Sequence, residues 1–423
     1  MNASVAILAL FLLADDATLS TKSTADPNPK SLLIPTDVQA NSQRLVALLG
    51  SRSFPVRKEA VTELQGLGRM ALPAIEEGLT TSTVPEVTLW CEQLLPQAQS
   101  LDLKARVECF LADADGKFKH DLPGATEFFR ITGPSEQART LFKELWLSSN
   151  RDLFLALTIS PEEAAKAVAV RRADLSNRAL SRVREIDAKS QPTSLEVLAM
   201  LFVESMIPER LLTAQNANIA VGRGILNPCG ILTQSALRAD LDVDGKKEVY
   251  GAIVSNWYET REETRTMYYC LTSSASMKVP VPLKLARKML ERKDAVPMYK
   301  AQAVCQLGRG GRKEDIETLL PLLKDETVVT AGIVAVGGNG NQVRSPIQQQ
   351  DTALAMTLVL NGDKPTDYGF NERYPNQTMS TTLRFNYMNF YFDDAEGKAK
   401  DLRAAALKKW DEKQAADKKP MKK

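Results

Sequence analysis

The sequence has very little of the chemistry on which many enzymes and metal proteins depend. Its 423 residues include one histidine, His120, which excludes most zinc sites and most catalysis by histidine. The five cysteines are odd in number, widely spaced and without a CxxC pair, so a disulfide framework is not expected, although one pair could still form. No GxSxG, HExxH or SxxK motif occurs. We therefore expect no cofactor, and we name no catalytic or metal-binding residue.

An excess of one charge and long apolar runs are also missing. The 54 basic and 52 acidic residues give a net charge of +2, too little to attract nucleic acid or an anionic membrane. The apolar run at residues 3–14 is shorter than the roughly 20 residues of a membrane span, and no later segment approaches that length. Its length and position predict a signal peptide at residues 1–17 and export to the periplasm or the extracellular space. The alternative is a buried N-terminal helix.

The most informative stretch is residues 54–79. Its first half carries an apolar stripe at helical spacing: Val56, Ala60, Leu64 and Leu67. Gly66 and Gly68 predict a turn, and Pro73 fits the first turn of a second helix. That helix has its own stripe: Leu72, Ile75 and Leu79. Neither helix could bury its stripe alone, so the pattern predicts neighbouring helices stacked on both.

This stretch resembles a HEAT-type repeat, with matching residues Arg57, Ala60, Leu64, Leu67, Gly68, Ala71, Pro73 and Leu79. A looser copy lies at residues 298–323, where the corresponding residues are Ala301, Val304, Leu307, Gly308, Ile316, Leu319, Leu320 and Leu323. The whole chain is similar to exported bacterial HEAT-like proteins with no assigned chemistry. The resemblance implies an all-α fold, a curved α-α superhelix, and it brings no catalytic residues.

Composition and periodicity predict how the chain is divided. Residues 18–37, rich in proline, serine and threonine, are expected to be a flexible leader before HEAT-like repeats at 38–112. Helical blocks are expected at 113–207 and 208–360, the latter holding the second repeat copy. Residues 361–392 are rich in aromatic rings and lack a helical period, which predicts an irregular cap over the end of the stack. Residues 393–423 are predicted to form a charged helix with a basic tail.

Several local signals predict where individual elements begin and end. Ser160 and Thr193, each followed three residues later by a glutamate, predict two helix N-termini. Separate helices are expected at residues 85–97 and 101–112. The β-branched run at 328–336 is expected to be broken by the glycines of 337–340. Asp351 is expected to cap a helix over 351–360.

Two loops have features of ligand sites. Asp240, Asp242 and Asp244 followed by Gly245 match the start of a calcium loop, but its last position is Gly251 instead of an acid, so an acidic turn is favoured. The glycine-rich basic segment 308–313 precedes a helix and could hold an anion, as could 337–341, but neither has a P-loop sequence. Ordinary turns are the favoured interpretation for both.

The last candidate functional residues are a stripe of arginines and His120. Residues 171, 172, 178, 182 and 184 are arginines, several on one helical face, which could bind phosphates. Acidic residues at 174, 185 and 187 dilute the stripe, so a solvated face is favoured. His120 has no nucleophile motif near it and is expected to be a surface residue.

The sequence therefore favours a non-catalytic helical-repeat scaffold that binds another protein or an extended ligand on a concave surface. A protein partner is expected and nucleic acid is not. The alternative is an enzyme or nucleic-acid-binding protein built on the same HEAT-like fold, which would use acidic residues and arginines within the groove.

Overall fold

The computed structural model describes residues 25–183, 191–213, 228–277, 279–280, 282–331, 334–337, 340–343, 346–372, 385–394 and 397–417. In these ranges the chain is mostly helical, with three two-stranded antiparallel ladders, so the predicted all-α class is confirmed at this level. The contacts divide the chain into two compact units, Met1–Glu127 (unit 1) and Phe128–Lys423 (unit 2). The predicted signal peptide lies outside the described residues. Within them, no helix combines the length and apolar character that crossing a bilayer requires.

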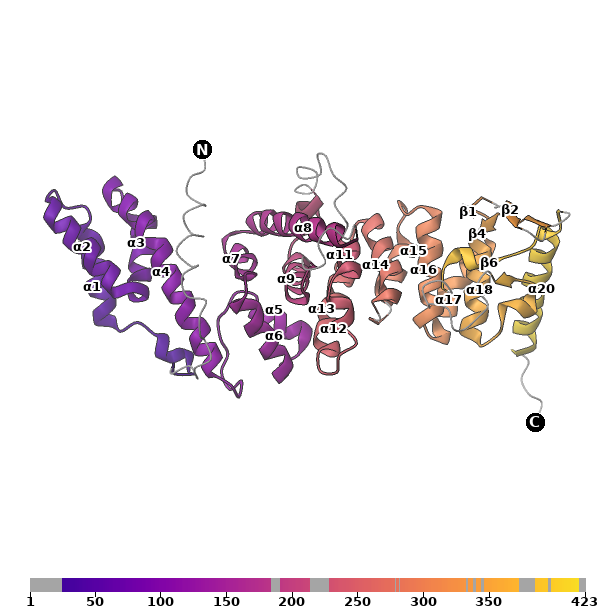
Figure 1. The fold of residues 1–423 in the computed structure, drawn as a ribbon, viewed down its shortest axis with the longest axis horizontal. Helices are drawn as coiled ribbons and strands as arrows, with labels where there is room; N and C mark the ends of the chain where they lie inside the picture. The colour runs from indigo at the N-terminus through magenta and orange to yellow at the C-terminus, as the bar shows by residue number, and fades with distance from the viewer. Residues whose placement is uncertain are drawn as a thin grey trace. The chain divides into compact units, whose positions relative to one another are not determined.

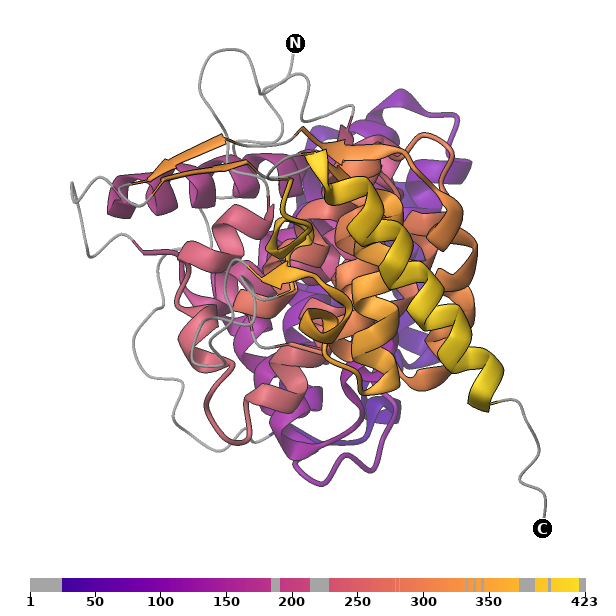
Figure 2. The same ribbon diagram turned by 90° about the vertical axis from the view of Figure 1, so that its right-hand side faces the viewer.

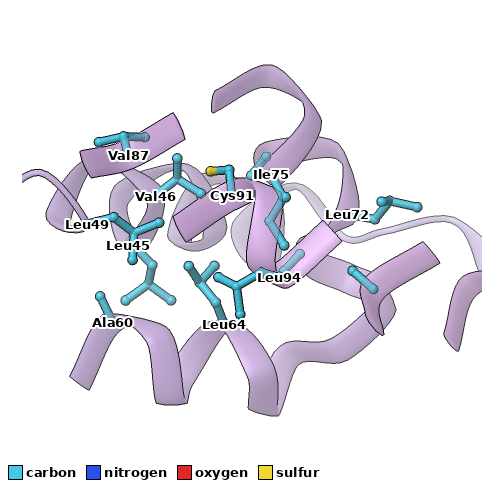
Figure 3. Packing of buried hydrophobic residues seen from close by; sticks show 13 residues of the cluster. Leu45, Val46, Leu49, Ala60, Leu64, Leu72, Ile75, Val87, Cys91 and Leu94 are labelled. Carbon is cyan, nitrogen blue, oxygen red and sulfur yellow. The ribbon is translucent and has the colours of Figure 1, made fainter. Parts of the chain in front are cut away.

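Unit 1 is a small helical assembly with an aliphatic core. Its elements are η1 (Pro29–Leu32), α1 (Thr36–Leu48), α2 (Phe54–Leu67), η2 (Gly68–Ala71), α3 (Leu72–Thr81) and α4 (Pro85–Ala112). Side chains spaced three or four residues apart share one face of each helix and converge in the core (Figure 3): Leu45, Val46, Leu49, Ala60, Leu64, Leu72, Ile75, Val87, Cys91 and Leu94.

Helix α4 corrects one prediction, because residues 85–97 and 101–112 belong to a single helix. Pro96 lies inside it, and the polar residues that follow do not end it. A proline removes one helical hydrogen bond, but Ala98 in the next turn is buried in the core of unit 1. Tertiary packing thus holds a segment helical that local sequence signals would interrupt.

The first half of unit 2 consists of helices, and the starts of two of them, α8 and α9, were predicted correctly from Ser160 and Thr193. They are α5 (Ala125–Thr132), which spans the unit boundary, α6 (Glu136–Leu147), α7 (Arg151–Ile159), α8 (Pro161–Val183), α9 (Ser194–Ser205), α11 (Pro228–Gln234), α12 (Leu237–Asp240) and α13 (Lys247–Glu259). The Ser160 hydroxyl accepts a hydrogen bond from the Glu163 amide at 3.1 Å before α8. Thr193 and Glu196 form a reciprocal capping box before α9. Four phenylalanine rings pack together between these helices: Phe128, Phe142, Phe154 and Phe202.

The second half of unit 2 continues with helices that follow one another in chain order (Figure 1). They are α14 (Thr264–Ser276), α15 (Leu283–Glu291), α16 (Pro297–Gly310), η4 (Lys313–Asp315), α17 (Ile316–Leu319), η5 (Leu320–Lys324), α18 (Gln349–Asn361) and α20 (Ala399–Asp417). Helix α16 packs against α14, α15 and α18, so it lies at the centre of this half.

The two predicted repeat copies form helices, but the helices of a copy do not pack mainly on each other. Gly68 ends α2 at a φ of +57°, a conformation that favours glycine, and η2 separates α2 from α3. Helix α2 packs against α1, and α3 packs against α1 and α4. In the second copy α16 packs against α15 and α18, and α17 also packs against α18. Each apolar stripe is therefore buried largely by a helix from outside its own copy.

The segment between η5 and α18 corrects two further predictions. The run at 328–336 is divided between β1 (Val328–Thr330), which pairs with β4 (Ile347–Gln348), and β2 (Val334–Gly337). Strand β2 pairs with β3 (Gly340–Val343), with Gly337 opposite Gly340, so these glycines belong to a hairpin and do not end the strand region. Asp351 is the third residue of α18 and accepts the Gln348 amide at 2.9 Å; the extended backbone of Gln348 makes that residue the N-cap.

The C-terminal part of unit 2 buries its aromatic rings beside α18. Its short elements are η6 (Pro365–Tyr368), β5 (Asn371–Glu372), η7 (Tyr387–Asn389) and β6 (Phe390–Tyr391), and β5 pairs with β6. Phe370 and Phe392 are buried with ring centroids 4.3 Å apart. Figure 2 shows α20 in front of this region, where Arg403 of α20 pairs with Asp351 of α18 at 2.6 Å.

Candidate functional site

The described arginines of the α8 stripe form hydrogen bonds and ion pairs with other residues of unit 2. Arg171 donates to the side-chain oxygen of Asn150 at 2.6 Å, and Arg178 donates to Glu196 at 2.6 Å. Arg172 instead points inward and lies 2.7 Å from Glu204. The Arg182 side chain and Arg184 lie outside the described part of the chain. The described arginines are therefore neutralised locally, which leaves little of the phosphate-binding face that the sequence allowed.

A buried ion triad links α8 and α9 to the end of α13. Glu204 lies between Arg172 and Arg261, at 2.7 Å and 3.0 Å, and its side chain is 2% exposed. Arg261 also donates to the backbone carbonyls of Glu204 and Trp257 and lies over the Trp257 ring. Charges removed from water to this degree require partners of opposite sign, so the triad fixes how these helices dock.

A second buried polar group surrounds Tyr258 of α13. The Tyr258 hydroxyl lies 2.9 Å from the Ser273 hydroxyl of α14, and the thiols of Cys229 and Cys270 lie 3.8 Å apart. Arg309 of α16 donates to Ser274 at 2.8 Å, one residue along from Ser273. Residues of α11, α13, α14 and α16 thus meet inside the helical packing.

Burial in this group favours the protonated, neutral forms of the tyrosine and the thiol. Burial raises the pKa of the Tyr258 hydroxyl and of the Cys270 thiol well above their usual values. Burial also lowers the pKa of the Arg309 guanidinium to about 10. A protonated thiol and a protonated phenol are poor nucleophiles, so the arrangement suits packing better than covalent catalysis.

His120 corrects the prediction of a surface residue. Its side chain is 5% exposed, and its Nε2 lies 2.9 Å from the carboxylate of Asp113, just after α4. The same carboxylate accepts the backbone amides of Lys117 and Phe118. The Cys109 thiol, which also interacts with Asp113, has its pKa raised by burial and by Asp26 and Asp113, which is the opposite of an activated nucleophile. The Asp113–His120 pair closes a loop.

The acidic turn at Asp240 is not arranged as a calcium loop. Asp240 is the last residue of α12, where its carboxylate accepts the Ser194 hydroxyl at 2.5 Å and pairs with Lys246 at 3.2 Å. Across the described residues, no group of three His, Cys, Asp or Glu side chains is placed to hold a metal ion. The Asp240–Ser194 hydrogen bond connects the end of α12 to the start of α9.

In the glycine-rich segment 308–313, Gly308 serves helix packing, and the basic residues near the turn contact the carboxylate of Asp315. Gly308 lies inside α16, where a Cβ atom would come within 2.2 Å of the Met356 sulfur of α18. After α16, the Asp315 carboxylate accepts the Arg312 amide at 2.9 Å and pairs with Arg287 at 2.6 Å. The anion that this turn binds is thus a side chain of the same unit.

The last candidate binding surface is a group of partly exposed tyrosines on α14 and α16. Tyr268 of α14 stacks on Tyr299 of α16 with ring centroids 4.7 Å apart, and Tyr269 lies 5.7 Å from Tyr268. The exposed Arg265 guanidinium lies 5.8 Å from the centre of the Tyr269 ring. These four residues are called the tyrosine surface below. Tyrosine and arginine are enriched at protein–protein interfaces, where a flat apolar ring and a polar tip are both used.

Sequence reasoning missed both buried groups and the tyrosine surface. Glu204 carried a usable signal, because it ends an apolar helix in which residues 197–203 are all buried. An acid at such a position requires a buried partner. The identity of the partner was out of reach, since Arg261 lies 57 residues further along the chain.

Comparison with protein-family models, with curated proteins and with solved structures finds no match to this chain. The HEAT-like resemblance therefore depends on the residues of the two copies alone.

Proposed function

We propose that this protein is an exported, non-catalytic helical-repeat scaffold that binds another protein through its tyrosine surface. In this proposal the helices form a HEAT-like superhelix, and the aromatic segment at 361–392 caps the end of the stack. The tyrosine surface is the observation that carries the proposal. It presents stacked rings beside an exposed guanidinium, a combination typical of interface hot spots.

Two further features support binding over catalysis. Buried groups that could have served as acids, bases or nucleophiles, such as Glu204 and Cys270, are bonded inside the helical packing. The described arginines of α8 are paired with groups of the same unit, which weakens the argument from the arginine stripe for a nucleic-acid or enzyme function. No observation in the described residues favours that alternative.

The test is a binding measurement on a double variant. Tyr268→Ala combined with Tyr299→Ala removes the ring stack, and we expect it to weaken binding of a partner captured from the exported fraction by about tenfold or more. The partner is then purified, and its affinity for each variant is measured by titration calorimetry. A thermal melt of each variant checks that unit 2 still folds.

The matched control removes exposed apolar side chains elsewhere in unit 2. Ile159→Ala with Val170→Ala changes side chains of α7 and α8 that are 72% and 67% exposed, and should leave affinity unchanged. Equal loss in both double variants would show that the tyrosine surface is not the binding site. Turnover of a substrate from a broad panel by the purified protein would contradict the scaffold itself.

A further inference from the structure

Two cysteines from distant parts of the sequence meet inside unit 2. Cys229 lies in α11 and Cys270 in α14, 41 positions apart, and their sulfur atoms are separated by 3.8 Å. Both are buried, Cys229 at 5% and Cys270 at 0% exposure. The other three cysteines lie in other helices, Cys91 and Cys109 in α4 and Cys305 in α16.

We propose that Cys229 and Cys270 are a site of covalent cross-linking, which forms a disulfide joining α11 to α14. A disulfide has a sulfur–sulfur distance of about 2.05 Å, so the two atoms must approach by less than ~2 Å. Helices α11 and α14 already pack against each other. Closing the remaining gap requires rotation of the two side chains toward each other.

The reaction is a thiol–disulfide exchange with a small-molecule or protein disulfide as the oxidant. One cysteine, as its thiolate, attacks the oxidant and forms a mixed disulfide, releasing the first thiol of the oxidant. The second cysteine, also as its thiolate, attacks the protein sulfur of that mixed disulfide and releases the second thiol. The two cysteines together lose two protons and two electrons, and the oxidant disulfide is reduced to two thiols.

Burial determines when this reaction can occur. In the folded unit the thiols are out of reach of an oxidant, and burial raises the pKa of Cys270, which suppresses the attacking thiolate. In the unfolded or partly folded chain both thiols are open to solvent. The bond should therefore form during folding in an oxidising compartment, and it should be slow to form or to break once unit 2 is folded.

The cross-link would constrain the part of unit 2 that holds the second buried polar group. The loop it closes contains α13 and therefore Tyr258, whose hydroxyl contacts Ser273 one turn after Cys270. A covalent loop of this length limits the unfolded chain and raises stability. The oxidising compartment rests on the export included in the proposed function, whereas the thiol count in a redox buffer tests the cross-link without export and without the tyrosine surface, which other residues form.

The experiment is to refold the reduced full-length protein in a glutathione redox buffer and count free thiols under denaturing conditions with a maleimide. We expect three reactive thiols instead of the five in the sequence, and a non-reduced peptide map that links the Cys229 and Cys270 peptides. The melting midpoint of unit 2 should fall by roughly 5 °C when the bond is reduced. Folded, reduced protein kept in the same buffer should lose its thiols many-fold more slowly.

Matched variants separate this pair from the other cysteines. Cys229→Ala and Cys270→Ala should each leave four free thiols and abolish the cross-linked peptide, whereas Cys305→Ala, also in a buried helix of unit 2, should leave two and retain it. Five free thiols after refolding of the unmodified protein, glutathione adducts in place of a cross-link, or a link through another cysteine would each overturn the proposal. If a variant fails to fold, the thiol count and the peptide map of the unmodified protein still decide whether the Cys229–Cys270 disulfide forms.

Discussion

Unit 1 packs α1 to α4 around a cluster of aliphatic and small side chains, whereas unit 2 buries a group of four phenylalanine rings in mutual contact, together with two arginines and a glutamate. The two cores differ in how many relative arrangements of their helices they allow. An aliphatic core accepts many arrangements of similar volume, but a buried charge is tolerated only where its partners are in place. Unit 2 should therefore be the more sensitive of the two to single polar substitutions, while both should be equally sensitive to crowding.

The largest expected effect comes from the ion triad of unit 2. Glu204→Gln leaves Arg172 and Arg261 without a countercharge in a buried setting, and should lower the free energy of unfolding of unit 2 by about 3–5 kcal/mol. Urea unfolding followed by tryptophan fluorescence measures this. Combined replacement with Arg172→Met and Arg261→Met should recover much of the loss.

The control for that prediction is a similar change in unit 1. Asp102→Asn breaks a partly exposed pair with Arg106 and should cost below ~1 kcal/mol. If both substitutions had the same small effect, the contrast drawn between the two cores would be wrong.

The next largest effect tests the carboxylate of Asp113, a charged group buried in unit 1. Asp113→Ala removes the acceptor for two backbone amides and for the His120 ring, and should cost unit 1 about 2–3 kcal/mol. Amide hydrogen exchange at Lys117 and Phe118 reports the loss locally. Asp113→Asn retains an acceptor and should lose less; a cost for Ala no larger than that for Asn would argue against the closed loop.

Crowding should affect the two units alike. A Cβ at Gly308 would lie 2.2 Å from the Met356 sulfur, and one at Gly78 would lie 2.6 Å from a Val46 methyl group. Gly308→Ala and Gly78→Ala should each cost about 1–2 kcal/mol despite the better helix propensity of alanine. Shortening the neighbour, by Met356→Ala or Val46→Ala, removes the closest of these atoms and should reduce the cost of the same glycine substitution, while the Met356 Cβ at 2.9 Å and the Cys91 sulfur at 3.0 Å remain close. Additive losses in the double variants, measured by thermal unfolding, would contradict direct contact.

The smallest expected effect is a loss of stability of unit 2 at acidic pH, through protonation of Glu196. Burial acts to raise the pKa of Glu196, but its bonds to Arg178 and Thr193 outweigh burial and lower that pKa below its usual 4.5. A lowered folded pKa means that this stabilisation is present above about pH 4.5 and is lost as pH falls through the folded value. Unit 2 should thus lose stability on acidification that Glu196→Gln does not lose, because glutamine does not titrate there. An identical pH profile for both proteins, from unfolding between pH 7 and pH 3, would exclude the effect.

Local signals predicted what depends on neighbours in the sequence. Ser160 and Thr193 marked helix starts because a capping hydrogen bond spans only three residues. Local signals gave wrong predictions where contacts beyond the next turn matter. Helix α4 continues past Pro96, with Ala98 buried in the core, and His120 is buried against Asp113 instead of lying on the surface. The buried groups at Glu204 and Cys270 were missed for the same reason, since each is completed by helices far apart in the chain.

By itself the sequence determined the helical class and the helix starts at Ser160 and Thr193, and it excluded the commonest catalytic and metal motifs, because these depend on spacing and residue type. Only the tertiary structure decided which helices pair, which arginines are neutralised, and which thiols and tyrosines meet. Those outcomes are set by contacts among side chains from separate helices, and the position of one helix against another is not encoded in the apolar stripe of either.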